Sequence, residues 1–118
     1  MDGLKILPPE EQALTEDTTT ADGIFIKRVV VPKRDSFVPQ HAHVWDHTTL
    51  LTNGAMFVWK AGVLDKCYTA PAAIYIAKGV KHLFRTVEDN TTFYCIHNLK
   101  GAQAVEIMAE HSLLDVEV

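Results

Sequence analysis

The sequence predicts a single all-β domain, an antiparallel sandwich or barrel that ends in one short helix. Short apolar segments rich in β-branched and aromatic residues recur along the chain, and turn residues separate them. Their spacing of roughly 8–12 residues, with no helical segments in between, is typical of antiparallel sheets. The 118 residues fit one domain, which buries enough surface to fold without a disulfide or a structural metal.

The order of the elements divides the chain into three parts. Residues 1–22 are polar and predict an N-terminal arm, whose few apolar residues could pair along a sheet edge or with a partner subunit. Residues 23–99 predict the β-barrel, with strands over 23–31, 37–44, 47–54, 55–62, 66–71, 72–79, 80–87 and 91–99. Residues 100–118 predict a C-terminal helix and tail, because apolar residues recur there at helical spacing.

The bulk composition excludes several classes of partner. The net charge is −4 and the eleven basic residues are scattered, so we expect no binding to nucleic acid. The longest apolar run, residues 70–77, is far too short to span a membrane, and the start of the chain lacks a secretory signal. Cys67 and Cys95 have no CxxC spacing and are read as two reduced strand residues. These features predict a soluble, cytoplasmic protein.

Four histidines indicate a metal site. His41, His43 and His47 lie within seven residues, and His82 follows a glycine-containing turn later in the chain. On a strand, residues two apart project from one face, so the imidazoles of His41 and His43 can converge on one ion. His47 keeps the same parity, and an antiparallel sheet can bring His82 across from them. The spacing therefore predicts a metal centre built from His41, His43, His47 and His82.

With these residues in place, the sequence resembles the cupins. The first cupin motif, G(x)5HxH(x)3–4E(x)6G, can be followed through His41 and His43 to Gly54, with Asp35 at the first glycine and His47 at the glutamate. The second motif, G(x)5PxG(x)2H(x)3N, matches at Gly79 and His82 but departs from the pattern at Pro71, Ala77 and Thr86. The resemblance covers roughly residues 24–99. It implies a jelly-roll-like cupin barrel, a central metal and a homodimer.

The resemblance carries His41, His43 and His82 over as metal ligands, and His47 takes the place of the glutamate. A histidine there would leave a divalent ion its full charge and favour anionic or enolised ligands. The alternative is that His47 lies near the metal without coordinating it, because catalytic sites often use three protein ligands. The resemblance favours iron, nickel or zinc, while imidazole ligands also accept cobalt or copper, and manganese stays an alternative.

The remaining candidates depend on which face of a strand is buried. The strand over 91–99 is apolar on both faces, so parity cannot choose between Phe93, Cys95 and His97 on one face and Tyr94 and Ile96 on the other. If His97 faces inward, it is a candidate catalytic acid/base or substrate anchor. The alternative is a rim or hydrogen-bonded histidine. We expect most of the large apolar side chains, among them Met56 and Tyr75, in the core, and some of them in the apolar wall of a pocket.

Three functions stay open at this point. The first is a mononuclear metal-dependent dioxygenase that acts on a small enolisable or anionic substrate. The second is a lyase, cyclase or isomerase that uses the ion, of which zinc is the simplest choice, as a Lewis acid. The third is a non-enzymatic module that binds a small molecule or a metal, since a fold does not imply catalysis.

Overall fold

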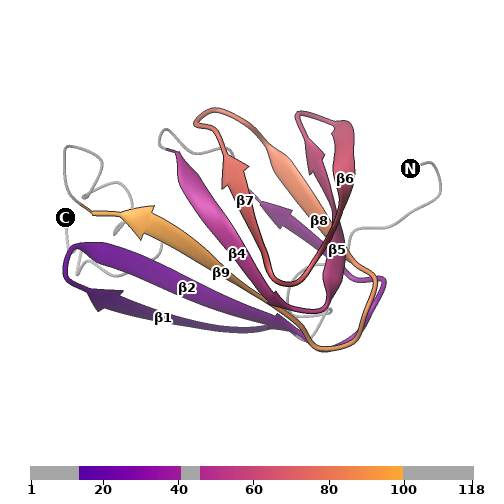
Figure 1. Cartoon of the computed structure of the whole chain (residues 1–118), viewed down its shortest axis with the longest axis horizontal. Helices are drawn as coiled ribbons and strands as arrows, with labels where there is room; N and C mark the ends of the chain where they lie inside the picture. Colours follow the sequence, from indigo (N-terminus) through magenta and orange to yellow (C-terminus); the bar gives the residue numbers. More distant parts are fainter. Residues whose placement is uncertain (1–13, 41–45, 100–118) are drawn as a thin grey trace, which may run out of the picture.

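The computed structural model describes residues 14–40 and 46–99, which form nine strands in two antiparallel sheets. Figure 1 shows the two sheets spread apart at one end of the molecule and drawn together at the other. The first sheet has the order β1 (Thr15–Ala21), β2 (Ile24–Val31), β9 (Thr91–Asn98), β4 (His47–Asn53) and β7 (Ala72–Ile76). The second has the order β3 (Phe37–Gln40), β8 (His82–Thr86), β5 (Ala55–Lys60) and β6 (Val63–Thr69).

The predicted all-β architecture is confirmed in this part of the chain. Each of the eight predicted strands contains or overlaps an observed one, from β2 to β9. The predicted C-terminal helix lies outside the described residues, as do Leu4, Ile6 and Leu7 of the predicted arm. The sequence did not predict β1, which lies within that arm and pairs with β2 over all seven of its residues.

Strand parity places one face of each central strand in the core. In β9 every second residue from Thr91 to His97 is buried, and the residues between them are partly exposed. The same alternation in β8 buries His82, Phe84 and Thr86. Because side chains alternate between the faces of a sheet, this pattern turns Leu83 and Arg85 outward.

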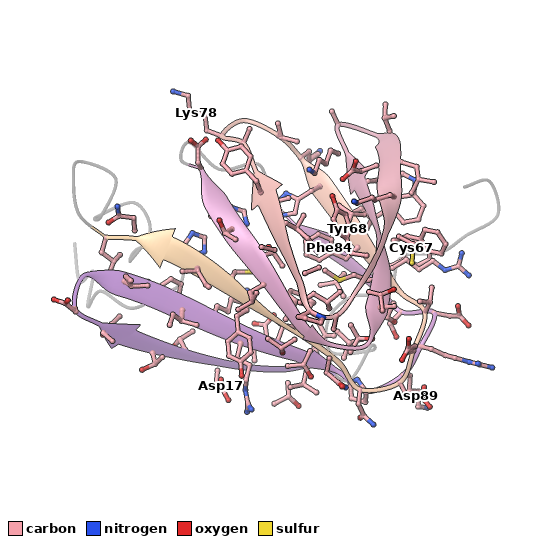
Figure 2. The ribbon with its side chains drawn as sticks, viewed as in Figure 1. Asp17, Cys67, Tyr68, Lys78, Phe84 and Asp89 are labelled. Carbon is pink, nitrogen blue, oxygen red and sulfur yellow. The ribbon has the colours of Figure 1, made fainter. Side chains whose placement is uncertain are left out.

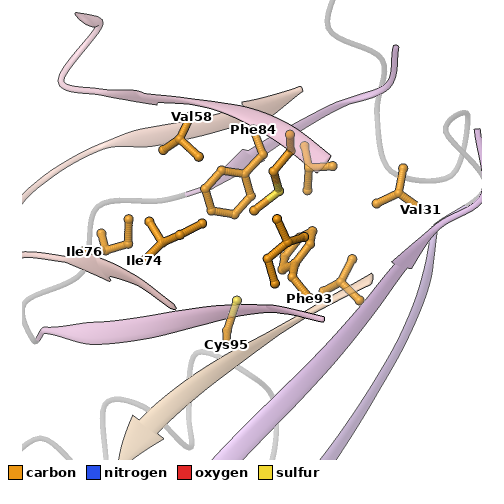
Figure 3. Packing of buried hydrophobic residues seen from close by; sticks show 11 residues of the cluster. Val31, Val58, Ile74, Ile76, Phe84, Phe93 and Cys95 are labelled. Atoms are coloured by element: carbon orange, nitrogen blue, oxygen red, sulfur yellow. The ribbon is translucent and has the colours of Figure 1, made fainter. Parts of the chain in front are cut away.

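The core lies between the two sheets (Figure 3). Phe84 of β8 and Phe93 of β9 are both fully buried and meet edge to face, with 5.1 Å between ring centroids and 84° between ring planes. This geometry is favourable for two aromatic rings, and it joins one sheet to the other. Around them pack aliphatic residues of both sheets: Val29, Val31, Val38, Leu51, Val58, Ile74 and Ile76.

Both cysteines are free. Cys67 is exposed on β6 (Figure 2), whereas Cys95 is buried on β9. Burial raises the pKa of the Cys95 thiol to about 11, because a thiolate is poorly solvated in the core. Tyr75, which we expected in the core, is 57% exposed because β7 buries Ile74 and Ile76 on its other face. Across the described ranges, no helix has the length and apolar character that crossing a membrane requires.

Candidate metal centre

Three histidines lie together between the sheets, at the end where the sheets are spread apart. His47 is the first residue of β4, His82 is the first of β8, and His97 is next to last in β9. The ring centroid of His47 is 5.4 Å from that of His82 and 4.9 Å from that of His97. All three side chains are at most 5% exposed. We call these residues the histidine cluster.

The strand register explains why these residues meet. Thr48 pairs with Ile96 in the β4–β9 ladder, so the next position along it brings His47 opposite His97. Both residues follow the buried parity of their strands. His82 starts the facing strand of the other sheet, where it pairs with Gln40 of β3 and with Lys60 of β5. Two sheets therefore contribute to one cluster.

Aromatic neighbours and one backbone contact fix the orientation of the rings. The ring of His97 stacks on Phe25, with 5.5 Å between centroids, and the ring of His82 lies 5.4 Å from that of Phe84. The Nδ1 atom of His82 lies 3.2 Å from the carbonyl oxygen of Val80. The tautomer with its proton on Nδ1 donates this hydrogen bond and carries its lone pair on Nε2. Metal-binding histidines commonly use such a backbone acceptor.

Asp46 connects the start of β4 to the turn before β8. Its Oδ1 atom accepts a hydrogen bond from the backbone N–H of Lys78 at 2.7 Å. This bond, followed by a hydrogen bond from the Tyr75 side chain, holds the pKa of the Asp46 carboxyl below its usual range. The carboxylate thus joins the residue before His47 to the segment that leads into His82.

A pocket of about 450 Å³ borders the cluster. It lies at the end of the first sheet, and its lining combines His47 and His97 with carboxylate, amide and hydroxyl groups: Asp22, Asp46, Thr48, Tyr75 and Asn98, together with Gly23, Ile24 and Ile96. Thr48, Tyr75 and Ile96 lie side by side on the outer face by register. The volume lies in the range of pockets that bind small molecules.

The structure locates three of the five predicted site residues. It brings His47 and His82 together, and it turns His97 inward, which settles the parity that the sequence left open. His41 and His43 lie outside the described residues. Among residues 14–40 and 46–99, no three His, Cys, Asp or Glu side chains are placed to hold a metal ion by themselves. Phe25 and Asp46 were not predicted, because nothing in a single sequence pairs them with distant histidines.

Comparison with solved structures shows that the chain has the cupin fold. One similar structure is a Cupin 2 conserved barrel domain protein from Salinispora arenicola, with a TM-score of 0.65 and 13% identity over 93% of this chain and 99% of that one. Another is an RmlC-like cupin from Methanocaldococcus jannaschii with a double-stranded β-helix fold, with a TM-score of 0.62 and 14% identity over 83% and 91% of the two chains.

A third similar structure is the cupin domain of Cnp3 from Schizosaccharomyces pombe, with a TM-score of 0.64 and 8% identity over 98% of this chain and 80% of that one. No protein-family model and no curated protein matches the sequence. At these identities the likeness establishes the fold, and it confirms the predicted cupin resemblance at that level. The function has to be argued from the site.

Proposed function

We propose that this protein binds one divalent transition metal at the histidine cluster and uses the site to bind and transform a small molecule. The observation that carries the proposal is the convergence of buried imidazoles from both sheets at one end of the barrel. Neutral imidazole is the commonest protein ligand for transition metals, which makes the donor set suitable.

The connectivity supports His41 and His43 as the remaining ligands. Gln40, which precedes His41 in the chain, pairs with His82, and the chain returns to the cluster at Asp46 and His47. The five residues between these two points are therefore tied at both ends to members of the cluster. We therefore propose His41 and His43, which fall in this interval of the sequence, as the remaining ligands.

The roles of the residues follow from their positions. His82 and His47, with His41 and His43, are the proposed ligands, and His97 is the proposed acid/base or substrate anchor beside them. A divalent ion held by imidazoles alone would keep its full charge and supply Lewis-acid activation of an anionic or enolised substrate. The pocket next to His47 and His97 offers room for a small molecule, and Asn98 and Thr48 in its lining can hydrogen-bond to it.

Metal analysis of variants tests the proposal. Untagged protein purified without chelators, analysed by mass spectrometry, should hold about one transition metal per chain, with iron, nickel or zinc preferred over manganese, cobalt and copper. His82→Ala should lose this metal, whereas His111→Ala, which changes a histidine outside both cupin motifs, should keep it. Absence of metal after reconstitution with each of these ions would contradict the proposal. Metal retained in His47→Ala would place that side chain beside the ion rather than on it.

The loaded protein then separates the candidate reactions. Oxygen uptake with enolisable substrates such as β-diketones would support a dioxygenase. Turnover without oxygen would support a Lewis-acid lyase, cyclase or isomerase. Tight metal binding without turnover over a broad substrate panel would favour the non-enzymatic binding module. In each enzymatic case, His97→Ala should lower kcat while the metal content stays unchanged.

A further inference from the structure

Lys60 lies beside the histidine cluster on the inner face of the second sheet. It is the last residue of β5, and it pairs directly with His82 of β8. Met56 and Val58, which share its parity in the strand, are fully buried, so the Lys60 side chain starts out from the same face as His82. Directly paired residues have Cβ atoms about 4.5–5.5 Å apart. A lysine therefore adjoins one of the proposed metal ligands.

Asp65 of β6 is the ion-pair partner of this lysine. The Nζ atom of Lys60 lies 3.4 Å from Oδ2 of Asp65. The hydroxyl of Tyr68 donates a hydrogen bond to the same oxygen atom, and the Tyr68 side chain packs against the core that contains Phe84 (Figure 2). Burial, followed by the hydrogen bond to Asp65, raises the pKa of Tyr68 to about 12, so its hydroxyl keeps the proton at neutral pH. Two donors therefore share one carboxylate oxygen.

The ion pair leaves much of the ammonium group available to a ligand. Both side chains of the pair are 33% exposed, and pairs of this kind stabilise a fold little. An ammonium group has three N–H donors, of which the single contact with Asp65 occupies one at most. The four methylene groups of the Lys60 side chain also span more than the distance between neighbouring strands. The ammonium group can therefore reach a molecule that is bound beside His82.

We propose that Lys60 binds a carboxylate group of the substrate while a second anionic group of the same molecule binds the metal ion. The expected substrate class is thus a small dicarboxylate. This inference rests on the proposed function, because the metal site supplies the first of the two anchors. A divalent ion held by imidazoles favours an anionic ligand, and the ammonium group adds a charge-assisted hydrogen bond to the second carboxylate. Lys60 is then a specificity-determining residue of the site.

Calorimetric titration with two matched ligands tests this role. Pentanoate differs from glutarate only in a methyl group that replaces the second carboxylate. Metal-loaded protein should bind glutarate at least about tenfold more tightly than pentanoate, since hydrogen bonds to charged groups contribute that much. Lys60→Met should lose this preference and leave the pentanoate affinity unchanged. Lys81→Met is the matched control, because it removes the same charge next to His82 in the sequence but from an exposed side chain, so the preference should remain.

Metal content, measured on the same samples, separates this inference from the proposed function. No preference for glutarate in the metal-loaded wild type, or an equal preference in Lys60→Met, would overturn the role of Lys60 and leave the metal site standing. If the wild type holds no metal, the same titration on the metal-free chain tests the ammonium group alone. A preference for glutarate that Lys60→Met abolishes would then support carboxylate binding by Lys60, and no preference would overturn it.

Thermal unfolding without ligand checks that the variants are folded. Lys60→Met should unfold at the same temperature as the wild type, because the lysine is partly exposed at the end of its strand. Lys60→Gln removes the charge with a different side chain and should lose the preference for glutarate in the same way. A preference retained in folded Lys60→Gln would contradict the proposal, whatever the stability of Lys60→Met.

Discussion

Gly54 lies between β4 and β5, where the chain passes from one sheet to the other. Its φ angle is +88°, and a Cβ atom added there would lie 2.5 Å from Oγ1 and 3.0 Å from Cα of Thr91. Gly62 has a similar φ of +79° in the β5–β6 turn but open space around it. Alanine at Gly62 therefore measures the free-energy cost of a left-handed backbone alone. Alanine at Gly54 adds the cost of the contact between the new Cβ atom and Thr91.

We predict that Gly62→Ala destabilises the protein by about 1 kcal/mol, because the left-handed conformation alone is penalised. Gly54→Ala should cost about 2–4 kcal/mol, because the backbone of Thr91 must also move. Urea unfolding, followed by tryptophan fluorescence, measures both free energies of unfolding. Equal losses in the two variants would show that the contact with Thr91 relaxes freely.

The departures from the cupin motifs have physical explanations at the same scale. Asp35 occupies a glycine position of the first motif and adopts a φ of +62°, which aspartate tolerates better than most residues. Thr86 stands where the second motif has asparagine. Its hydroxyl accepts a hydrogen bond from the backbone N–H of Ser36 and donates one to the carbonyl of Lys33, both at 3.1 Å. The spacing of the two cupin motifs could be recognised in the sequence because these positions constrain the backbone. The residue at each position can vary as long as it satisfies that constraint.

At the scale of the elements, the alternation of apolar and polar residues predicts a strand and its buried face only where one face is apolar and the other polar. In β8, His82 was predicted to point inward as a metal ligand, and the observed alternation buries it together with Phe84. In β9, Tyr94 and Ile96 are also apolar, so the inward position of His97 could be found only from its pairing with β2 and β4. β1 was not predicted because all of its side chains are exposed, so its sequence has no apolar face that would indicate a strand.

Asp46 offers a test of how two elements are held at the proposed metal centre. It joins the start of β4 to Lys78, and Asp89 makes an equivalent bond to the backbone N–H of Arg34 at 3.0 Å. Figure 2 shows Lys78 and Asp89 at opposite ends of the molecule. Asp46→Ala should lower the metal affinity about tenfold, since changes around metal ligands typically cost 10–100-fold. Asp89→Ala is the matched control and should leave the affinity unchanged.

Competition with a chromophoric chelator at neutral pH measures both metal affinities. Because the pKa of Asp46 is lowered in the fold, its carboxylate is ionised at the pH of this measurement, and the contribution of its hydrogen bond to stability is lost only as the pH falls through the lowered pKa. Unchanged affinity in Asp46→Ala would show that the two strands keep their spacing without the carboxylate. Equal weakening in both variants would point to a general loss of structure instead.

For the molecule as a whole, the histidine cluster lies at the starts of β4 and β8 and near the end of β9, while Phe84 and Phe93 join the two sheets within the core. Figure 1 shows the two sheets spread apart at this end of the strands. His47 and His97 belong to one sheet and His82 to the other. A metal bound there would cross-link the sheets, and it would bind the folded chain in preference to the unfolded one. Metal binding should therefore raise the free energy of unfolding of the whole domain, because the ligand binds the folded state alone.

Thermal unfolding tests this coupling. With free metal at a hundredfold excess over the dissociation constant, the stabilisation is about 2.7 kcal/mol, which corresponds to a rise in Tm of roughly 10 °C for a domain of this size. The rise should depend on the logarithm of the metal concentration and should disappear in His82→Ala. That variant should unfold in one transition without metal, which shows that its own fold is intact. An equal rise in Tm in His82→Ala and the wild type would place the bound metal elsewhere and remove the link between the sheets.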